Sequence, residues 1–236
     1  MTLLAGTSGY AFKEWKGAFY PADLGDDGWL GYYASRFPTV EINNTFYRLP
    51  KEQVLREWSA QVPPPFTFSI KASQRITHHA RLKPECADAV DFLLRNTAVL
   101  GERLGPILFQ LPPNLKKDVG RLRGFLGLLP SDRRYTIEFR HESWFDDEVL
   151  DALRERDIAL CLNEQDDFKC PVHATASWGY LRLHRLDYSA ELLAEWAKCV
   201  SDQKWSDTYV YFKHDEGNGS GPPAVDAFTQ ACATVS

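Results

Sequence analysis

The chain has 236 residues, of which 44% are hydrophobic and 25% charged, and its formal net charge is −5. It contains no apolar run of 18 residues and no signal-peptide pattern at its start, which argues against a membrane protein and predicts a cytoplasmic one. The negative charge disfavours wholesale attraction to nucleic acid, although a local basic patch is compatible with it. Five cysteines without a CxxC pair match neither a zinc site nor a disulfide framework.

Eight short apolar runs predict β-strands that alternate with helical patterns. The predicted strands are residues 3–8, 39–43, 66–72, 106–111, 135–140, 158–163, 179–184 and 208–213. The predicted helices are residues 27–37, 51–61, 85–104, 118–129, 146–157, 189–200 and 223–235. Between strands six and seven, residues 164–178 have no helical period and predict an irregular loop in place of a helix. Residues 214–223 are rich in glycine and proline and predict a mobile loop at the rim of a barrel mouth.

Eight strand–helix repeats in this length predict one domain over residues 1–236, a single (β/α)8 TIM barrel of the α/β class. The alternative is a doubly wound open sheet. No GxGxxG or GxxxxGK[ST] loop follows any predicted strand, so the usual dinucleotide and P-loop interpretations have no support.

Polar side chains follow the period of two near the carboxyl ends of several predicted strands. In the fifth strand, Glu138 and Arg140 face the same way, and buried charges are costly unless they are paired or used. The same alternation predicts that further polar residues face the barrel interior: Glu41, Asn43, Lys71, Gln110, Arg182, His184 and Lys213. Barrel enzymes build their active sites at this end of the strands. The pattern therefore predicts a ligand pocket, with a structural ion-pair network as the alternative.

Seven blocks of sequence resemble the YecE-like family (domain of unknown function 72). They are residues 6–21, 39–50, 68–82, 104–113, 135–144, 180–189 and 209–215. The resemblance implies a TIM barrel with a polar pocket at the carboxyl ends of the strands, and it implies no particular reaction. Two places depart from the family pattern. Asn163 stands where the family often has aspartate, and Lys213 opens a Lys-His-Asp segment where many members have an asparagine-rich one.

Acid–base chemistry is the leading interpretation of the inward residues. Glu41 and Glu138 are the candidate acid and base, and Lys71 is expected to tune them or to act itself as a base or Schiff-base former. Arg140 and Arg182 are suited to hold a carboxylate or phosphate. His184 is a candidate titrating group at the mouth, and a purely structural histidine is the equal alternative.

Further residues are expected to line the pocket. Asn43, Gln110, Asn163 and Lys213 belong to the substrate-binding set. His78 follows strand three and is expected either to act in a lid or to pack locally. The aromatic wall candidates are Tyr10, Tyr47 and Trp144, which follow strands one, two and five. They would stack on a ligand or anchor the long loops.

The predicted function is that of an enzyme, a hydrolase, lyase or isomerase, acting on a small anionic or sugar-like molecule. The alternatives are an endonuclease-like barrel that receives an extruded nucleotide and a non-catalytic ligand-binding protein. Glu41, Glu138, Asn163 and His184 carry atoms suited to a divalent cation, but the surrounding lysines and arginines favour an anion. No metal ligand is therefore assigned, and the sequence specifies neither a cofactor nor an oligomeric state.

Overall fold

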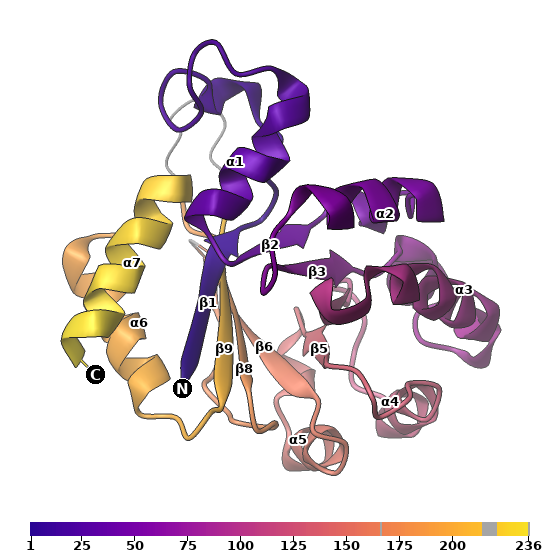
Figure 1. The fold of residues 1–236 in the computed structure, drawn as a ribbon. Coiled ribbons are helices and arrows are strands. Elements are labelled where there is room, and N and C mark those ends of the chain that lie inside the picture. The colour runs from indigo at the N-terminus through magenta and orange to yellow at the C-terminus, as the bar shows by residue number, and fades with distance from the viewer. Residues whose placement is uncertain (166, 214–220, 236) are drawn as a thin grey trace.

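The computed structural model describes residues 1–165, 167–213 and 221–235. Its centre is a nearly closed, TIM-like barrel of eight parallel strands in the order β1-β9-β8-β6-β5-β4-β3-β2 (Figure 1). The strands are β1 (Thr2–Thr7), β2 (Thr39–Ile42), β3 (Thr67–Lys71), β4 (Leu104–Gln110), β5 (Tyr135–Glu138), β6 (Ala159–Gln165), β8 (Gly179–Leu183) and β9 (Asp207–Phe212). All eight coincide with predicted strands, and the α/β barrel prediction is confirmed at this level.

The segment between β6 and β8 contains a strand that the sequence did not predict. β7 (Phe168–Lys169) pairs antiparallel with the end of β6. A two-residue strand is too short to show any periodicity, so only the folded chain reveals it. Of the predicted rim loop, residues 214–220 lie outside the described residues, and the last three belong to the first turn of a helix.

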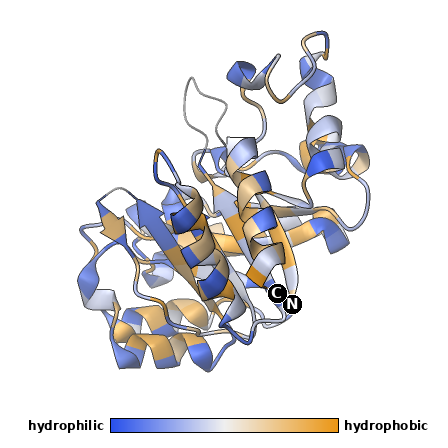
Figure 2. Cartoon of the chain, turned by 90° about the vertical axis from the view of Figure 1, so that its left-hand side faces the viewer, coloured by the Kyte–Doolittle hydropathy of each residue, from blue (hydrophilic) through white to orange (hydrophobic). Residues whose placement is uncertain are grey.

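Helices surround the barrel (Figure 1). They are α1 (Trp29–Arg36), α2 (Glu52–Gln61), α3 (Ala87–Thr97), α4 (Val119–Leu126), α5 (Asp147–Arg154), α6 (Ala190–Ser201) and α7 (Gly221–Val235). Three begin at an N-cap whose side chain accepts a backbone N–H: Asp118, Asp146 and Ser189. The helices carry both hydrophobic and hydrophilic residues (Figure 2), as expected of elements that cover a core. Among the described residues, no helix has the length and apolar character to span a membrane.

The two faces of the strands contact different surroundings. Outward side chains such as Ile70, Phe109 and Ile137 are buried in the main core with the helices. Inward side chains form a separate buried cluster: Leu108, Ala159, Cys161, Trp178, Tyr180, Tyr209 and Tyr211. Tyrosines therefore fill much of the interior, and their hydroxyls supply hydrogen bonds where a typical barrel has branched apolar side chains.

The barrel has one seam, between β1 and β2, the two ends of the hydrogen-bonded strand order. Tyr33 of α1 bridges this seam. Its hydroxyl accepts the backbone N–H of Thr7 at 2.8 Å and donates to the carbonyl of Thr39 at 3.2 Å. Gly6 permits the close approach, because a Cβ there would lie 2.1 Å from the Thr39 carbonyl oxygen. The Tyr33 side chain thus joins β1 and β2 in place of a ladder of backbone hydrogen bonds.

Tyr33→Phe is expected to lower the free energy of unfolding by about 2 kcal/mol, because the buried Thr7 N–H and Thr39 carbonyl lose their shared partner. Urea denaturation measures this loss. Tyr32→Phe is the matched control, since its half-buried ring packs against the same aromatic cluster and its hydroxyl makes no hydrogen bond within the described chain. Equal losses in the two variants would mean that the hydroxyl bridge contributes nothing.

Candidate functional site

A pocket of about 610 Å³ opens at the carboxyl ends of the strands. Eight predicted residues line it: Asn43, Tyr47, Lys71, His78, Gln110, Arg182, His184 and Lys213. Three lining residues were not predicted: Ser8, Phe12 and Phe46. Ser8 continues the inward period of β1 and follows the same alternation as the other polar residues, so its parity could have identified it. Phe12 lies in a loop and Phe46 in a short 3-10 helix, Asn44–Phe46, so neither has a strand parity that could reveal it.

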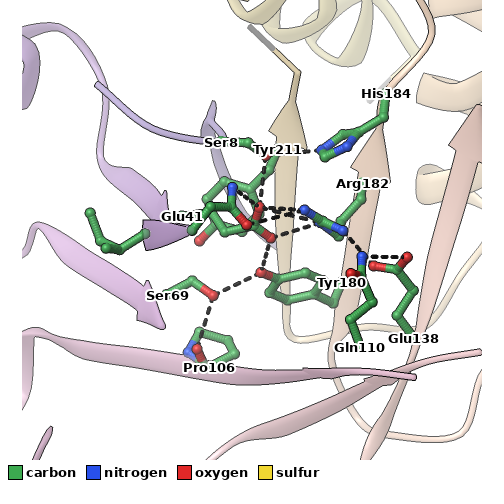
Figure 3. A network of polar contacts seen from close by, with 12 residues as sticks. Ser8, Glu41, Ser69, Pro106, Gln110, Glu138, Tyr180, Arg182, His184 and Tyr211 are labelled. Atoms are coloured by element: carbon green, nitrogen blue, oxygen red, sulfur yellow. Dashed lines mark hydrogen bonds and ion pairs between the residues drawn. The ribbon is translucent and has the colours of Figure 1, made fainter. Parts of the chain in front are cut away.

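Two buried glutamates share one arginine on the floor of the pocket (Figure 3). Arg182 of β8 donates from Nε and Nη2 to Glu41 of β2, at 2.9 and 3.0 Å. Its Nη1 donates to Oε2 of Glu138 on β5. Both glutamates are fully buried, and the arginine is only 3% exposed. One guanidinium on β8 thus joins β2 and β5, which are separated by β3 and β4 in the strand order.

Each glutamate has further hydrogen-bond donors. Glu41 accepts the hydroxyls of Ser8 and Tyr180, both at 2.7 Å, and the amide of Asn43 at 3.0 Å. Glu138 accepts the amide of Gln110 at 2.9 Å and Nε of Arg140 at 2.7 Å.

These contacts determine the charge state of the two carboxylates. Burial would raise the pKa of Glu138, but the charges of Arg182 and Arg140 and their hydrogen bonds outweigh it and lower the pKa to about 2. Burial likewise opposes ionisation of Glu41, and the Arg182 charge with the surrounding donors lowers its pKa below the usual value. Both side chains are therefore ionised at neutral pH. Neither carries a proton to donate, so the geometry supports positioning for Glu41 and Glu138 instead of acid catalysis.

Arg140 has more capacity for a ligand than Arg182. The Arg182 guanidinium already serves both glutamates, and its Nη2 also contacts Asn43 Oδ1 at 3.3 Å. Arg140 uses only Nε for Glu138, and its side chain is 30% exposed. Within the described chain its two terminal nitrogens have no hydrogen bond. The anion-holding role that the sequence suggested for both arginines is thus available mainly to Arg140.

Lys71 is the inward lysine of β3. Its Nζ lies 4.5 Å from the centre of the Phe46 ring, and it has no hydrogen bond or ion pair with any described residue. Burial, followed by the charge of Arg182, lowers the pKa of Lys71 to about 8, and Glu41 and Glu138 only partly oppose this. The Lys71 amine therefore exchanges its proton near neutral pH.

His184 is held by Ser8 in one tautomer. The two side chains approach to 2.9 Å between Oγ and Nε2. Because Ser8 gives its single hydrogen to Glu41, we assign the proton of neutral His184 to Nε2. Burial and the nearby Arg182 charge lower the pKa of His184 well below its ordinary value. His184 is accordingly a neutral imidazole.

His78 lies in a short π-helix, Arg75–His79, that follows β3. Its Nδ1 is 2.9 Å from the hydroxyl of Thr77, and its ring packs edge-on against Phe46 at 4.9 Å. Burial and the neighbouring Lys71 charge lower the pKa of His78. His78 is therefore a second neutral imidazole beside the lysine.

Six predicted residues are not among those that line this pocket. Glu41, Glu138 and Arg140 lie behind its lining, joined to it through the hydrogen bonds described above. The other three are Trp144, Tyr10 and Asn163. Trp144 was wrongly assigned to the wall, because it is fully buried, stacks on the outward Phe139 at 4.8 Å and donates Nε1 to the carbonyl of Leu115. Tyr10 lines an adjoining cavity of about 250 Å³ that shares Ser8, Phe12 and Asn43 with the main pocket. Asn163 is buried beside Arg182 in the β6–β8 register, and its side-chain amide has no hydrogen bond to any residue that the structure describes.

Tyr47 and Lys213 mark the rim. Tyr47 is 75% exposed, and Lys213 follows β9 with an exposed side chain. The other two residues of the Lys-His-Asp segment lie outside the described residues. In the part of the chain that the structure describes, no group of three or more histidine, cysteine or acidic residues is arranged to hold a metal ion.

Comparison with known proteins links this chain to a protein family. The family model described as "Protein of unknown function DUF72" matches residues 4–235. The UPF0759 protein YecE of Escherichia coli K12 is 28% identical over 225 residues, covering 83% of this chain and 82% of that protein. The UPF0759 protein YunF of Bacillus subtilis 168 is 27% identical over 257 residues, covering 89% and 87%.

Solved structures agree with the sequence matches. The crystal structure of a DUF72 family protein from Thermotoga maritima has a TM-score of 0.83 and 26% identity, with complete coverage of both chains. A DUF72 family protein from Enterococcus faecalis has a TM-score of 0.82 at 18% identity, with 98% of this chain and 96% of that chain covered. The second likeness supports the fold alone.

Proposed function

The chain belongs to the DUF72 family, and from that premise we propose that it is an enzyme that performs acid–base chemistry on a small anionic or sugar-like molecule in the barrel mouth. The family contributes a fold and no reaction, so the proposal is argued from the pocket. The proposal takes the whole chain to be a single (β/α)8 domain.

The observation that carries the proposal is Lys71. An amine with a pKa of about 8 in an open pocket is present in both protonation states near neutral pH, which is what proton transfer requires. Glu41 and Glu138 are engaged by Arg182 and do not pair with this lysine. Lys71 is therefore the proposed base.

An anionic substrate follows from the surrounding charges. Lys71, Arg140, Arg182 and Lys213 lie in or beside the pocket, and among the residues that the structure describes only Glu41 and Glu138 oppose them there. Four positive groups against two negative ones leave an excess of positive charge. The terminal nitrogens of Arg140 suit a carboxylate or phosphate, with Lys213 at the rim as a second contact.

The proposed chemistry assigns one role to each group. Arg140 and Lys213 hold the anionic group of the substrate, and unprotonated Lys71 removes a proton from its body. Glu41 and Glu138 stay ionised and position Arg182, Asn43 and Gln110 around the reacting centre. This arrangement resists rearrangement during proton transfer because each carboxylate has several donors.

Thermal melts with small organic acids and sugar phosphates test the proposal. A ligand at about a hundred times its Kd stabilises the folded state by about 2.7 kcal/mol, which raises the Tm of a chain of this size by roughly 5–10 °C. Arg140→Gln is expected to lose most of that rise. Arg95→Gln, which removes an arginine from an exposed helical ion pair, should keep it. If no anion of either class shifts the Tm, the proposed substrate class is wrong.

A further inference from the structure

We propose that Lys71 is a covalent site, at which the ε-amine adds to the aldehyde or ketone of an anionic substrate and forms an imine. The inference rests on the proposed function, because the same pocket must first bind the anion. It adds the chemical class of the substrate, an anionic carbonyl compound.

The isolation of the amine is the first argument. A lysine paired with a carboxylate holds its proton and is a poor nucleophile. Here the oxygens of the two buried glutamates accept hydrogen bonds from Arg182, Arg140 and neutral donors. Lys71 makes no ion pair with a described residue. Burial beside the positive charge of Arg182 also favours the unprotonated form. The pocket therefore presents a nucleophilic amine to an entering ligand.

The surroundings of the amine also suit the product. An imine is protonated to an iminium cation, and Lys71 Nζ lies 4.5 Å from the centre of the Phe46 ring. An aromatic face at this distance stabilises a cation. Asn43 and Gln110 each give one amide hydrogen to a glutamate, and each amide carries a second hydrogen that has no acceptor in the described chain. These hydrogens are available to a ligand oxygen.

The step balances without an oxidant or reductant. The unprotonated amine attacks the carbonyl carbon, and a proton passes from nitrogen to oxygen to give a carbinolamine. The hydroxyl then leaves as water with the second nitrogen proton. The overall change converts amine and carbonyl into imine and water. His78 is the neutral side chain placed to relay the proton, since it lines the same pocket and packs against Phe46.

Reductive trapping with glyoxylate and sodium cyanoborohydride at pH 7 tests the inference. Peptide mass spectrometry compares carboxymethylation at Lys71 with that at Lys198, whose side chain is 70% exposed. At pH 7 an amine with a pKa of about 8 has a free-base fraction roughly two-hundredfold larger than that of an ordinary lysine. We expect Lys71 to be labelled at least tenfold faster. Lys71→Met and Lys71→Arg should each lose this label and keep the one at Lys198.

Two controls separate the covalent step from anion binding. Glycolate has the carboxylate of glyoxylate but no aldehyde. It should raise the Tm and protect Lys71 from glyoxylate. Arg140→Gln should lower the ratio of glyoxylate labelling to neutral propionaldehyde labelling at Lys71 about tenfold, because the Arg140 charge also helps to lower the pKa of Lys71 and its loss through that effect slows both aldehydes alike.

The measurements distinguish a failure of the covalent inference from a failure of the anion-binding proposal. If Lys71 is labelled no faster than Lys198 while glycolate still raises the Tm, the covalent inference is overturned and the anion-binding proposal stands. If Lys71 is labelled rapidly but Arg140→Gln and glycolate have no effect, the anionic substrate class is overturned.

Discussion

Arg182→Met is expected to lower the free energy of unfolding by about 5 kcal/mol at pH 7. Removing one partner of a buried ion pair typically costs about 3–5 kcal/mol, because the remaining charge is buried without compensation. Here two carboxylates, Glu41 and Glu138, lose the same partner, and both are fully buried. The expected cost therefore lies at the upper end of that range. Urea denaturation followed by circular dichroism measures it.

Arg140→Met is the matched control, since it removes a second arginine from Glu138. Arg140 is partly exposed and contributes a single hydrogen bond to that carboxylate, so its loss should cost about 1 kcal/mol. The triple variant Glu41→Gln, Glu138→Gln, Arg182→Met should recover much of the stability, because no buried charge is left unpaired. Equal costs for Arg182→Met and Arg140→Met would contradict the central role of Arg182.

Acidification is expected to remove about 3 kcal/mol of stability through Glu138 alone. The pKa of this carboxyl falls from 4.5 to about 2 on folding, and each unit corresponds to about 1.4 kcal/mol. Because the folded pKa is the lower one, the contribution is complete above about pH 4.5 and is lost as the pH falls to about 2. Glu41, whose pKa is also lowered, acts in the same direction. Denaturation at a series of pH values measures the slope.

Glu138→Gln is expected to flatten this pH dependence, since an amide does not titrate. The variant should be less stable than the parent at pH 7 and should lose less stability on acidification. Asp91→Asn is the control, because this carboxylate belongs to an exposed helical ion pair and its removal should leave the profile nearly as steep. A parent and a Glu138→Gln variant with the same slope would show that Glu138 does not have the lowered pKa.

The lowered pKa values change the roles that we expect for the two glutamates. The sequence suggested one acid and one base, because two glutamates face inward from different strands. In the folded chain both have cationic and neutral donors, and their proton affinities fall together instead of diverging. Lys71 is left as the lysine with a pKa near neutrality in this pocket. We therefore propose that the Lys71 amine transfers the proton and that the two carboxylates position the groups around it.

Three features that the sequence does not predict share a cause in packing. Trp144 follows β5 closely, which suggested the barrel mouth, but it stacks on Phe139, whose side chain belongs to the outward set. Ser8 has the inward parity of β1, but parity alone does not show that it links Glu41 to His184. The hydroxyl of Tyr33, which joins β1 to β2, had no sequence signature at all. Each depends on contacts with residues distant in the sequence.

The sequence by itself determined the eight strands, their alternation with helices and the inward direction of Glu41, Lys71, Glu138 and Arg182. These features follow from local backbone geometry, since a period of two in a strand and of 3.6 in a helix can be read from neighbouring residues. Only the tertiary structure decided which charges are matched. Arg182 and Glu41 are 141 positions apart in the chain, and their contact depends on how the barrel closes. That closure leaves Lys71 without a carboxylate partner among the described residues, and the reactivity proposed for it rests on this packing.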